Sequence, residues 1–307
     1  QGKFGTVISD GSWGTTKGRY VYFPEEVDYY KALYKNAIFS QTQNLAVSGS
    51  DGKFDYYLSG RYYYYDGLFN SKTQTDKYNS MNMRAKMGYQ ATPWLKISNN
   101  FDLAYNKYYN PITYSEGSGV VYRNIADEGH PSSPILNPDG TLTFCGVYSV
   151  GDLLYGQSGI NTVNEVLKNT TSFNSKFFNN TLRINGDFTY KKTTYERTKK
   201  EAYTPYAKSV DADGNSVLEY IKDPSGDKFS ETNDWTRYIA TNIYAEYENT
   251  FADKHYFKAM GGWNYEQSQF KDVYTANTDF LTPDIENLNL TMGPDNKTTT
   301  SSWSAYK

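Results

Sequence analysis

The sequence predicts an all-β protein, an antiparallel up-and-down transmembrane β-barrel, and three observations support this fold class. Polar and apolar residues alternate with period two, short and long connections alternate along the chain, and aromatic residues stand beside the short connections. Hydrophobic residues make up 38% of the 307 residues and aromatic residues 17%, which excludes a disordered chain. A mean hydropathy of -0.75 does not argue against a membrane protein, because the strands of membrane barrels carry polar residues at every second position.

Alternation is the side-chain repeat of a β-strand, and it is clearest in five runs. These runs span 81–89, 95–105, 182–190, 243–251 and 257–265, and shorter or more tyrosine-rich runs span 44–49 and 54–65. In the first run Met81, Met83 and Met87 share one face. Arg84 and Lys86 share the other. A slip of one residue would exchange the two faces, so the pattern specifies the register of each strand.

The connections between these runs differ in length in a regular way. Short connections are expected at 50–53, 91–93, 174–180 and 252–254, and longer ones at 66–77, 110–165, 199–234 and after about 274. In an up-and-down sheet every second connection lies at the same end. All tight turns are therefore expected at one end and all long loops at the other, as in outer-membrane barrels with short periplasmic turns and long extracellular loops.

Aromatic residues beside the short turns are expected to form an interfacial girdle. Trp94, Phe178, Phe251 and Tyr256 lie next to these turns, and Trp263 is assigned to the same girdle. The alternating runs reach 10 to 17 residues, and a transmembrane strand needs about 9–11. The alternative is that these aromatic residues close the end of a soluble β-sheet core.

The polar face of the same strands is expected to line an interior. The residues assigned to it are Arg61, Arg84, Lys86, Lys96, Asp102, Arg183, Asp187, Glu246, Glu248 and Lys258. Because both signs of charge are mixed, this face predicts a hydrated, hydrogen-bonding wall rather than a filter for ions of one sign.

Outside the strands, the best helix signal lies at 24–36, where Pro24 stands at a first-turn position and carboxylates follow it. Residues 1–40 are therefore expected to form the entry to the barrel, and residues 41–307 its strands and loops. The net charge of -3 argues against a nucleic-acid partner. One cysteine excludes an internal disulfide, and two histidines leave little for metal chemistry, so no cofactor is expected.

Several segments resemble one family. The segments that match are 41–50 (QTQNLAVSGS), 54–62 (FDYYLSGRY), 78–86 (YNSMNMRAK), 134–141 (PILNPDGT) and 253–262 (DKHYFKAMGG). Taken together and in this order, they are similar to barrel segments of SusC/RagA-type TonB-dependent transporters.

This resemblance implies a 22-stranded barrel with an internal plug domain, in the outer membrane of Bacteroidetes-type bacteria. It also implies import of oligosaccharides or peptides, a SusD-like lipoprotein lid and energy from TonB. Two transporters pair in many members of this family, and the sequence leaves open whether they pair here. The plug, the TonB motif and the remaining strands are expected outside these residues. The protein is expected to be a transporter and not an enzyme.

Substrate contact is expected in the long loops, where tyrosines gather. The candidate residues are Tyr109, Tyr114, Tyr122, Tyr148 and Tyr155. Aromatic rings stack on sugars, and tyrosine hydroxyls supply hydrogen bonds to sugars or peptides. The alternative is that these rings pack the loops together or against a lid protein.

Two other patterns have ordinary explanations. Glu246 and Glu248 imitate a catalytic carboxylate pair, but alternating strands produce such pairs routinely. Residues 211–215 (DADGN) imitate a calcium loop without its closing glutamate, and a hairpin turn is the preferred interpretation.

Two rival functions remain open from the sequence. One is a soluble or surface-attached β-sheet adhesin that binds glycans through its tyrosines. The other is a small passive porin or structural barrel of about eight strands.

Overall fold

The computed structural model describes most of the chain. The described residues are 8–9, 18–19, 27–73, 75–113, 121–137, 139–211, 213–220, 227–294 and 297–307. Pro24 and Tyr114 lie outside these ranges, and the side chain of Tyr122 is not described.

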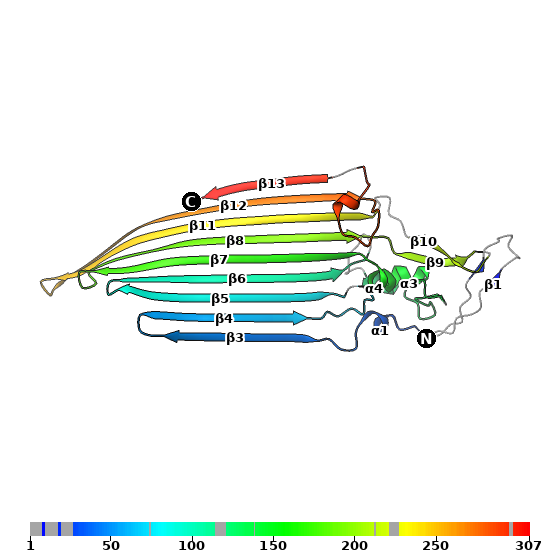
Figure 1. Cartoon of the computed structure of the whole chain (residues 1–307), viewed down its shortest axis with the longest axis horizontal. Coiled ribbons are helices and arrows are strands. Elements are labelled where there is room, and N and C mark those ends of the chain that lie inside the picture. Colours follow the sequence, from blue (N-terminus) through cyan, green and yellow to red (C-terminus); the bar gives the residue numbers. More distant parts are fainter. Residues whose placement is uncertain are drawn as a thin grey trace.

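One antiparallel sheet of nine strands dominates the structure (Figure 1). Its strands are β3 (Ser40–Ser50), β4 (Phe54–Tyr65), β5 (Lys77–Thr92), β6 (Leu95–Pro111), β7 (Gly159–Phe177), β8 (Leu182–Glu201), β11 (Lys228–Phe251), β12 (His255–Thr278) and β13 (Lys297–Tyr306). Each strand pairs with the strands before and after it within this sheet. The sheet is therefore an up-and-down meander, as predicted. β3 and β13 are its two edges and do not pair with each other.

The two ends of the sheet differ as the connection lengths predict. Short turns join β3 to β4, β5 to β6, β7 to β8 and β11 to β12, and all four lie at the left end in Figure 1. The helices and a second, smaller sheet lie at the right end. Turn chemistry fits the short end: Gly52, Asn180 and Asp253 have positive φ, which glycine, asparagine and aspartate adopt at low cost.

Strand pairing places the two predicted faces on opposite sides of the sheet. One row of paired residues crosses seven strands: Phe54, Tyr89, Ile97, Phe173, Gly186, Ile243 and Trp263. We call the side that carries this row the apolar face. Gly186 belongs to it because the ring of Phe173 occupies the space where a side chain would lie.

The other side, the polar face, is defined by a second row across the same strands. Its members are Ser59, Arg84, Asp102, Lys168, Lys191, Tyr238 and Ser268. All ten charged residues assigned to the interior from the sequence have the parity of this face. Because each residue keeps its side of the sheet along the paired strands, the sheet is a wall with one apolar and one polar side.

The register also gives the tilt of the strands. In the β3–β4 hairpin the tip, at Gly52, lies two residues beyond the row that contains Phe54. In the β11–β12 hairpin the tip, at Asp253, lies ten residues beyond Ile243 of the same row. With a rise of about 3.3 Å per residue and a strand spacing of about 4.8 Å, tips in one plane require a tilt of about 40°. Strands of outer-membrane barrels tilt by about 35–45°.

The long connections hold more structure than the sequence predicts. One helix was expected; the structure has α1 (Tyr29–Leu33), α2 (Val121–Glu128), α3 (Phe144–Gly146), a π-helical turn η3 (Val147–Gly151), α4 (Asp152–Tyr155) and a 3₁₀ turn η4 (Leu288–Leu290). Among the described residues, no helix has the length and hydrophobicity to cross a membrane. The apolar sides of α1, α2 and α4 pack into one core around Leu33, Val121 and Leu153, which are at most 1% exposed.

Region 199–234, expected as a loop, is also partly strand. β8 continues to Glu201 and β11 begins at Lys228, and between them β9 (Pro205–Val210) and β10 (Ser216–Tyr220) form a hairpin. The hairpin joins β1 (Ile8–Ser9) and β2 (Gly18–Arg19) in the small sheet, in the order β1-β2-β9-β10.

The prediction for the end of the chain was wrong in one respect. Residues 293–302 were expected as loop, yet β13 begins at Lys297 and pairs with β12 from Ala276 to Gln267. Its sequence is rich in serine and threonine, so hydrophobic alternation is weak there. Threonine fits a strand through its branched Cβ, and the exposed edge of β12 supplies hydrogen-bond partners.

The two-faced wall predicts opposite effects for neighbouring residues. Ala259 lies on the apolar face, about 15 Å from the Asp253 tip at the derived tilt. An Ala259→Arg substitution places a cation in the apolar band and should lower the free energy of unfolding in lipid vesicles by about 2–4 kcal/mol.

The matched control is Met260→Arg. Met260 is 69% exposed and lies on the polar face opposite Glu246, so this variant should unfold like the unsubstituted protein. Equal destabilisation by the two substitutions, measured by urea titration of the full-length protein, would contradict the assignment of faces.

Candidate functional site

The polar face is the candidate site, because it carries hydrogen-bonding and charged groups along most of its length. Lys96 Nζ lies 2.8 Å from Asp55 Oδ1, and Arg84 Nε lies 2.5 Å from Asp102 Oδ1. Both pairs join residues of different strands on the same face. They leave the wall polar and close to neutral, as a hydrated interior requires.

Near the short turns, Arg183 is the centre of a charge cluster on this face. It donates hydrogen bonds to both Glu246 and Glu248, and Lys258 Nζ lies 3.2 Å from the second oxygen of Glu246. The guanidinium group of Arg183 and the ammonium group of Lys258 therefore neutralise both carboxylates. This environment supports the structural interpretation of the glutamate pair over a catalytic one.

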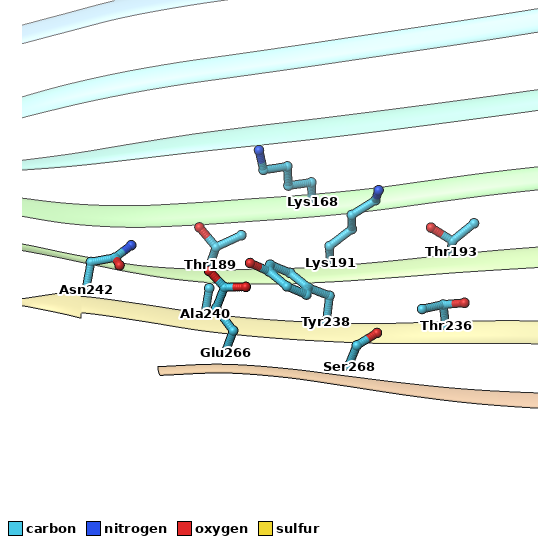
Figure 2. Close-up of a pocket in the computed structure, with 10 residues that line it drawn as sticks. All are labelled: Lys168, Thr189, Lys191, Thr193, Thr236, Tyr238, Ala240, Asn242, Glu266 and Ser268. Atoms are coloured by element: carbon cyan, nitrogen blue, oxygen red, sulfur yellow. The ribbon is translucent and has the colours of Figure 1, made fainter. Parts of the chain in front are cut away.

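Further along the wall, side chains of four strands surround a cavity of about 500 Å³ (Figure 2). Its lining residues are Lys168, Thr189, Lys191, Thr193, Thr236, Tyr238, Ala240, Asn242, Glu266 and Ser268. Tyr238 and Glu266 line it from neighbouring strands, β11 and β12. The lining thus combines donors and acceptors of both charges with one aromatic ring, which suits a polar oligomer better than an ion or a lipid.

Sequence reasoning assigned none of the three charged residues of this cavity, Lys168, Lys191 and Glu266, to the polar face. The two lysines are the clearest omission. They face each other across β7 and β8, and neither makes an ion pair within the part of the chain that the structure describes. Both lie beyond the alternating runs recognised in the sequence, which ended β8 at 190 and did not include the middle of β7. Continuing the alternation of Arg183 and Asp187 by four residues would have found Lys191.

The structure does not bring the predicted tyrosines together on one surface. Tyr155 packs against the helical core, and burial raises the pKa of its hydroxyl. Tyr109 lies on the apolar side of β6 with its ring over Gly159. Tyr148 is 38% exposed and stacks on Phe144, with ring centroids 6.2 Å apart. Of the three whose side chains are described, Tyr148 offers its ring to solvent.

The aromatic residues assigned to the girdle have different positions. Trp94 lies in the β5–β6 turn against Phe177, Phe178 is 78% exposed in the β7–β8 turn, and Phe251 ends β11 on the apolar face. Tyr256, in contrast, has the parity of the polar face and pairs with Thr250. Its neighbour Phe257 takes the apolar side.

Trp263 lies on the apolar face but far from the turns. It is ten residues from Asp253, which at the derived tilt places it about 25 Å above the tips. Because the apolar band of an outer-membrane barrel is about 25 Å tall, Trp263 fits the opposite border of the band rather than the turn end.

Metal ligands do not gather in the described residues: they contain no group of three or more histidine, cysteine, aspartate or glutamate side chains that could hold an ion. Asp211, in the calcium-like segment, instead accepts hydrogen bonds from the backbone N–H groups of Asp213 and Asn215 at 3.0 and 2.8 Å. These bonds hold the pKa of its carboxyl below the usual range and close the β9–β10 turn.

A carboxyl pair lies at the outer end of the polar face. Asp234 and Asp272 are direct partners on β11 and β12, and they share a hydrogen bond. Loss of solvent around Asp234, together with the hydrogen bond and negative charge of Asp272, raises the pKa of Asp234 to about 6. Asp234 is nineteen residues from the Asp253 tip, about 48 Å of height and therefore outside the apolar band.

This pair predicts a pH dependence with a definite sign. A carboxyl whose pKa is raised on folding stabilises the protonated form, so its contribution is complete below the ordinary pKa of 3.8 and is lost as the pH rises through about 6. The outer ends of β11 and β12 should open more often at pH 7.5 than at pH 5. Hydrogen exchange of amides 230–236, corrected for intrinsic rates, measures this. An Asp234→Asn variant should lose the dependence and Asp272→Asn should weaken it, whereas Asp213→Asn, in the exposed β9–β10 turn, should keep it.

Comparison with known proteins gives one curated relative. The chain is 23% identical over 285 residues to the TonB-dependent receptor P3 of Formosa agariphila, covering 89% of this chain and 26% of that protein. No protein-family model matches the chain.

The fold is similar to that of solved transporters. The RagAB peptide transporter superposes with a TM-score of 0.57 at 13% identity, covering 92% of this chain and 31% of that chain. The RagAB peptide importer in its closed-closed state gives a TM-score of 0.62 at 14% identity with the same coverage. The chain thus spans less than a third of the length of these proteins. These likenesses confirm the predicted resemblance, fold class and outer-membrane location: the chain is similar in sequence to part of a TonB-dependent receptor and in fold to part of a RagAB transporter.

Proposed function

We propose that this chain forms part of the wall of an outer-membrane importer for peptides or oligosaccharides, energised through TonB. The observation that carries the proposal is the continuous polar face, backed by an apolar face on strands tilted like those of a barrel. Similarity to the RagAB peptide transporter over 92% of the chain supports it. In the whole protein, further strands close a barrel of 22 strands, and a plug domain fills the space beside the polar face.

Peptides are the substrate class that the polar face favours. Carbonyl, amide and charged groups of a peptide match a wall on which Arg84, Asp102 and the lysines of the Figure 2 cavity alternate. Oligosaccharides are the second candidate, supported by the exposed stacked rings of Phe144 and Tyr148 at the long-loop end.

The partners of the proposed importer belong at opposite ends of the wall. A SusD-like lipoprotein lid would rest on the helices and the small sheet at the long-loop end, where substrate arrives. TonB would act from the short-turn end through a segment outside this chain. The relatives are named as transporters and a receptor, and we propose import without chemical conversion of the substrate.

Deletion of the gene for the full-length protein tests this function. Cells lacking it should lose uptake of one oligomer class, either peptides from a tryptic digest of casein or xylo-oligosaccharides. Mass spectrometry of the medium measures how much of each oligomer the cells remove. Loss of TonB should have the same effect. Uptake that persists without TonB would identify a passive porin, and a protein extracted in plain buffer without detergent would support the adhesin.

A pair of variants separates the two substrate classes. Phe144→Ala combined with Tyr148→Ala removes the exposed stack and should weaken oligosaccharide binding about tenfold, because stacked rings contribute about 1.5 kcal/mol. Peptide uptake should not change. Tyr30→Ala, which removes a ring that is 54% exposed near the same end, is the matched control.

A further inference from the structure

A group of cations lies on the apolar side of the sheet, where lipid rather than substrate is the neighbour. Lys192 on β8 and Arg237 on β11 are direct cross-strand partners, and Lys271 on β12 is two residues further toward the long-loop end. All three side chains are exposed. Like charges placed opposite each other destabilise a sheet unless something neutralises them.

Nothing in the described part of the chain neutralises this group. None of the three cations makes an ion pair there, although other lysines and arginines of the sheet do. The nearest acidic residues on the same face are Glu165 on β7, which is paired with Thr194, and Glu196 on β8, which is four residues beyond Lys192. Three cations against two carboxylates leave the surface positive, so an anion is the missing partner.

Height above the hairpin tips places the cations at a membrane border. At the derived tilt, Lys192, twelve residues from Asn180, lies about 30 Å above the plane of the tips, and Arg237, sixteen residues from Asp253, lies about 40 Å above it. The apolar band is about 25 Å tall and begins near Phe251, two residues from Asp253. The cations thus lie between the border of the band and about 10 Å beyond it, the depth of lipid headgroups.

The surface beneath Arg237 is also shaped for an amphiphile. A shallow hollow of about 170 Å³ is lined by Tyr190, Arg237, Ile239, Gln267 and Gln269. The ring of Trp235 lies 4.6 Å from the guanidinium carbon of Arg237 and restricts its orientation. Tyr190, Ile239 and Gln267 form the row on the band side, and Arg237 and Gln269 form the row on the outer side. The larger apolar groups therefore lie toward the acyl chains of a bound lipid, and the guanidinium lies toward its headgroup.

We propose that Lys192, Arg237 and Lys271 bind the phosphorylated headgroup of a lipid in the outer leaflet of the membrane. Arginine pairs with phosphate through two parallel hydrogen bonds, and the lysines add charge. This proposal depends on the outer-membrane location of the chain and is independent of which substrate is imported. Its function would be to fix the depth and orientation of this part of the barrel.

Native mass spectrometry of the full-length transporter in mild detergent tests the site, with diphosphoryl lipid A as the added lipid. The unsubstituted protein should retain it. The variant Lys192→Gln with Arg237→Gln should retain at least tenfold less. The control Lys53→Gln with Lys254→Gln removes the same charge at the short turns and should bind normally, and a shift in gel mobility on heating verifies that each variant is folded.

Two further arms decide the source of the anion. Dephosphorylated lipid A should bind the unsubstituted protein as weakly as diphosphoryl lipid A binds the variant with Lys192→Gln and Arg237→Gln. Equal binding of both lipids to the unsubstituted protein, or unchanged retention of diphosphoryl lipid A by that variant, would overturn the proposal. Displacement of lipid A by inorganic phosphate alone would also overturn it, because that result identifies a site for free anions.

Discussion

The structure depends on the unbroken hydrogen-bond ladder between neighbouring strands. A backbone N–H or C=O left unpaired in lipid costs several kcal/mol, so a chain can cross the membrane as strands only when each strand has partners on both sides. From β4 to β11 every strand is paired along most of its length on both sides, whereas β12 is paired with β13 over ten of its 24 residues. β3 and β13 each have one free edge, and a closed barrel requires further strands there.

This ladder also determines the two faces. Because pairing carries the parity of each residue to the next strand, one apolar residue fixes the side of every residue in its row. The row from Phe54 to Trp263 and the row from Ser59 to Ser268 are consequences of this rule. Lipid contact, the lining of the interior and the position of the cations all follow from parity and height, without any further assumption about the side chains.

Much of this architecture could be predicted from the sequence, because period two survives wherever one face meets lipid. The meander, the segregation of turns and loops, and the ten residues of the polar face came from that signal. The helices of the long connections could not be predicted, since α3 and α4 have three and four residues and are held by tertiary packing around Leu153. Beyond the apolar band alternation has no lipid to enforce it, so the outer ends of β8 and β11 were assigned to a loop.

The candidate site was predictable in part for the same reason. Alternation placed Arg84 and Asp102 on one face, but whether a charge is paired depends on its neighbours on adjacent strands. Arg183 has two carboxylates on β11, whereas Lys168 and Lys191 have each other. The sequence of one strand does not show which residues of the adjacent strands lie opposite it. The tyrosines of the loops show the same limit, because Tyr155 and Tyr148 belong to adjoining helical segments and differ only in which side packs on the core.

The central claim is that this sheet crosses the membrane with one face in lipid and the other in water. Single nitroxide labels at successive positions from 257 to 265 on β12 of the full-length protein, with Cys145 replaced by serine, test it most directly. In lipid vesicles, collision rates with oxygen should peak at the odd-numbered residues and rates with a water-soluble nickel complex at the even-numbered ones. Equal accessibility of both faces to the nickel complex would contradict the account.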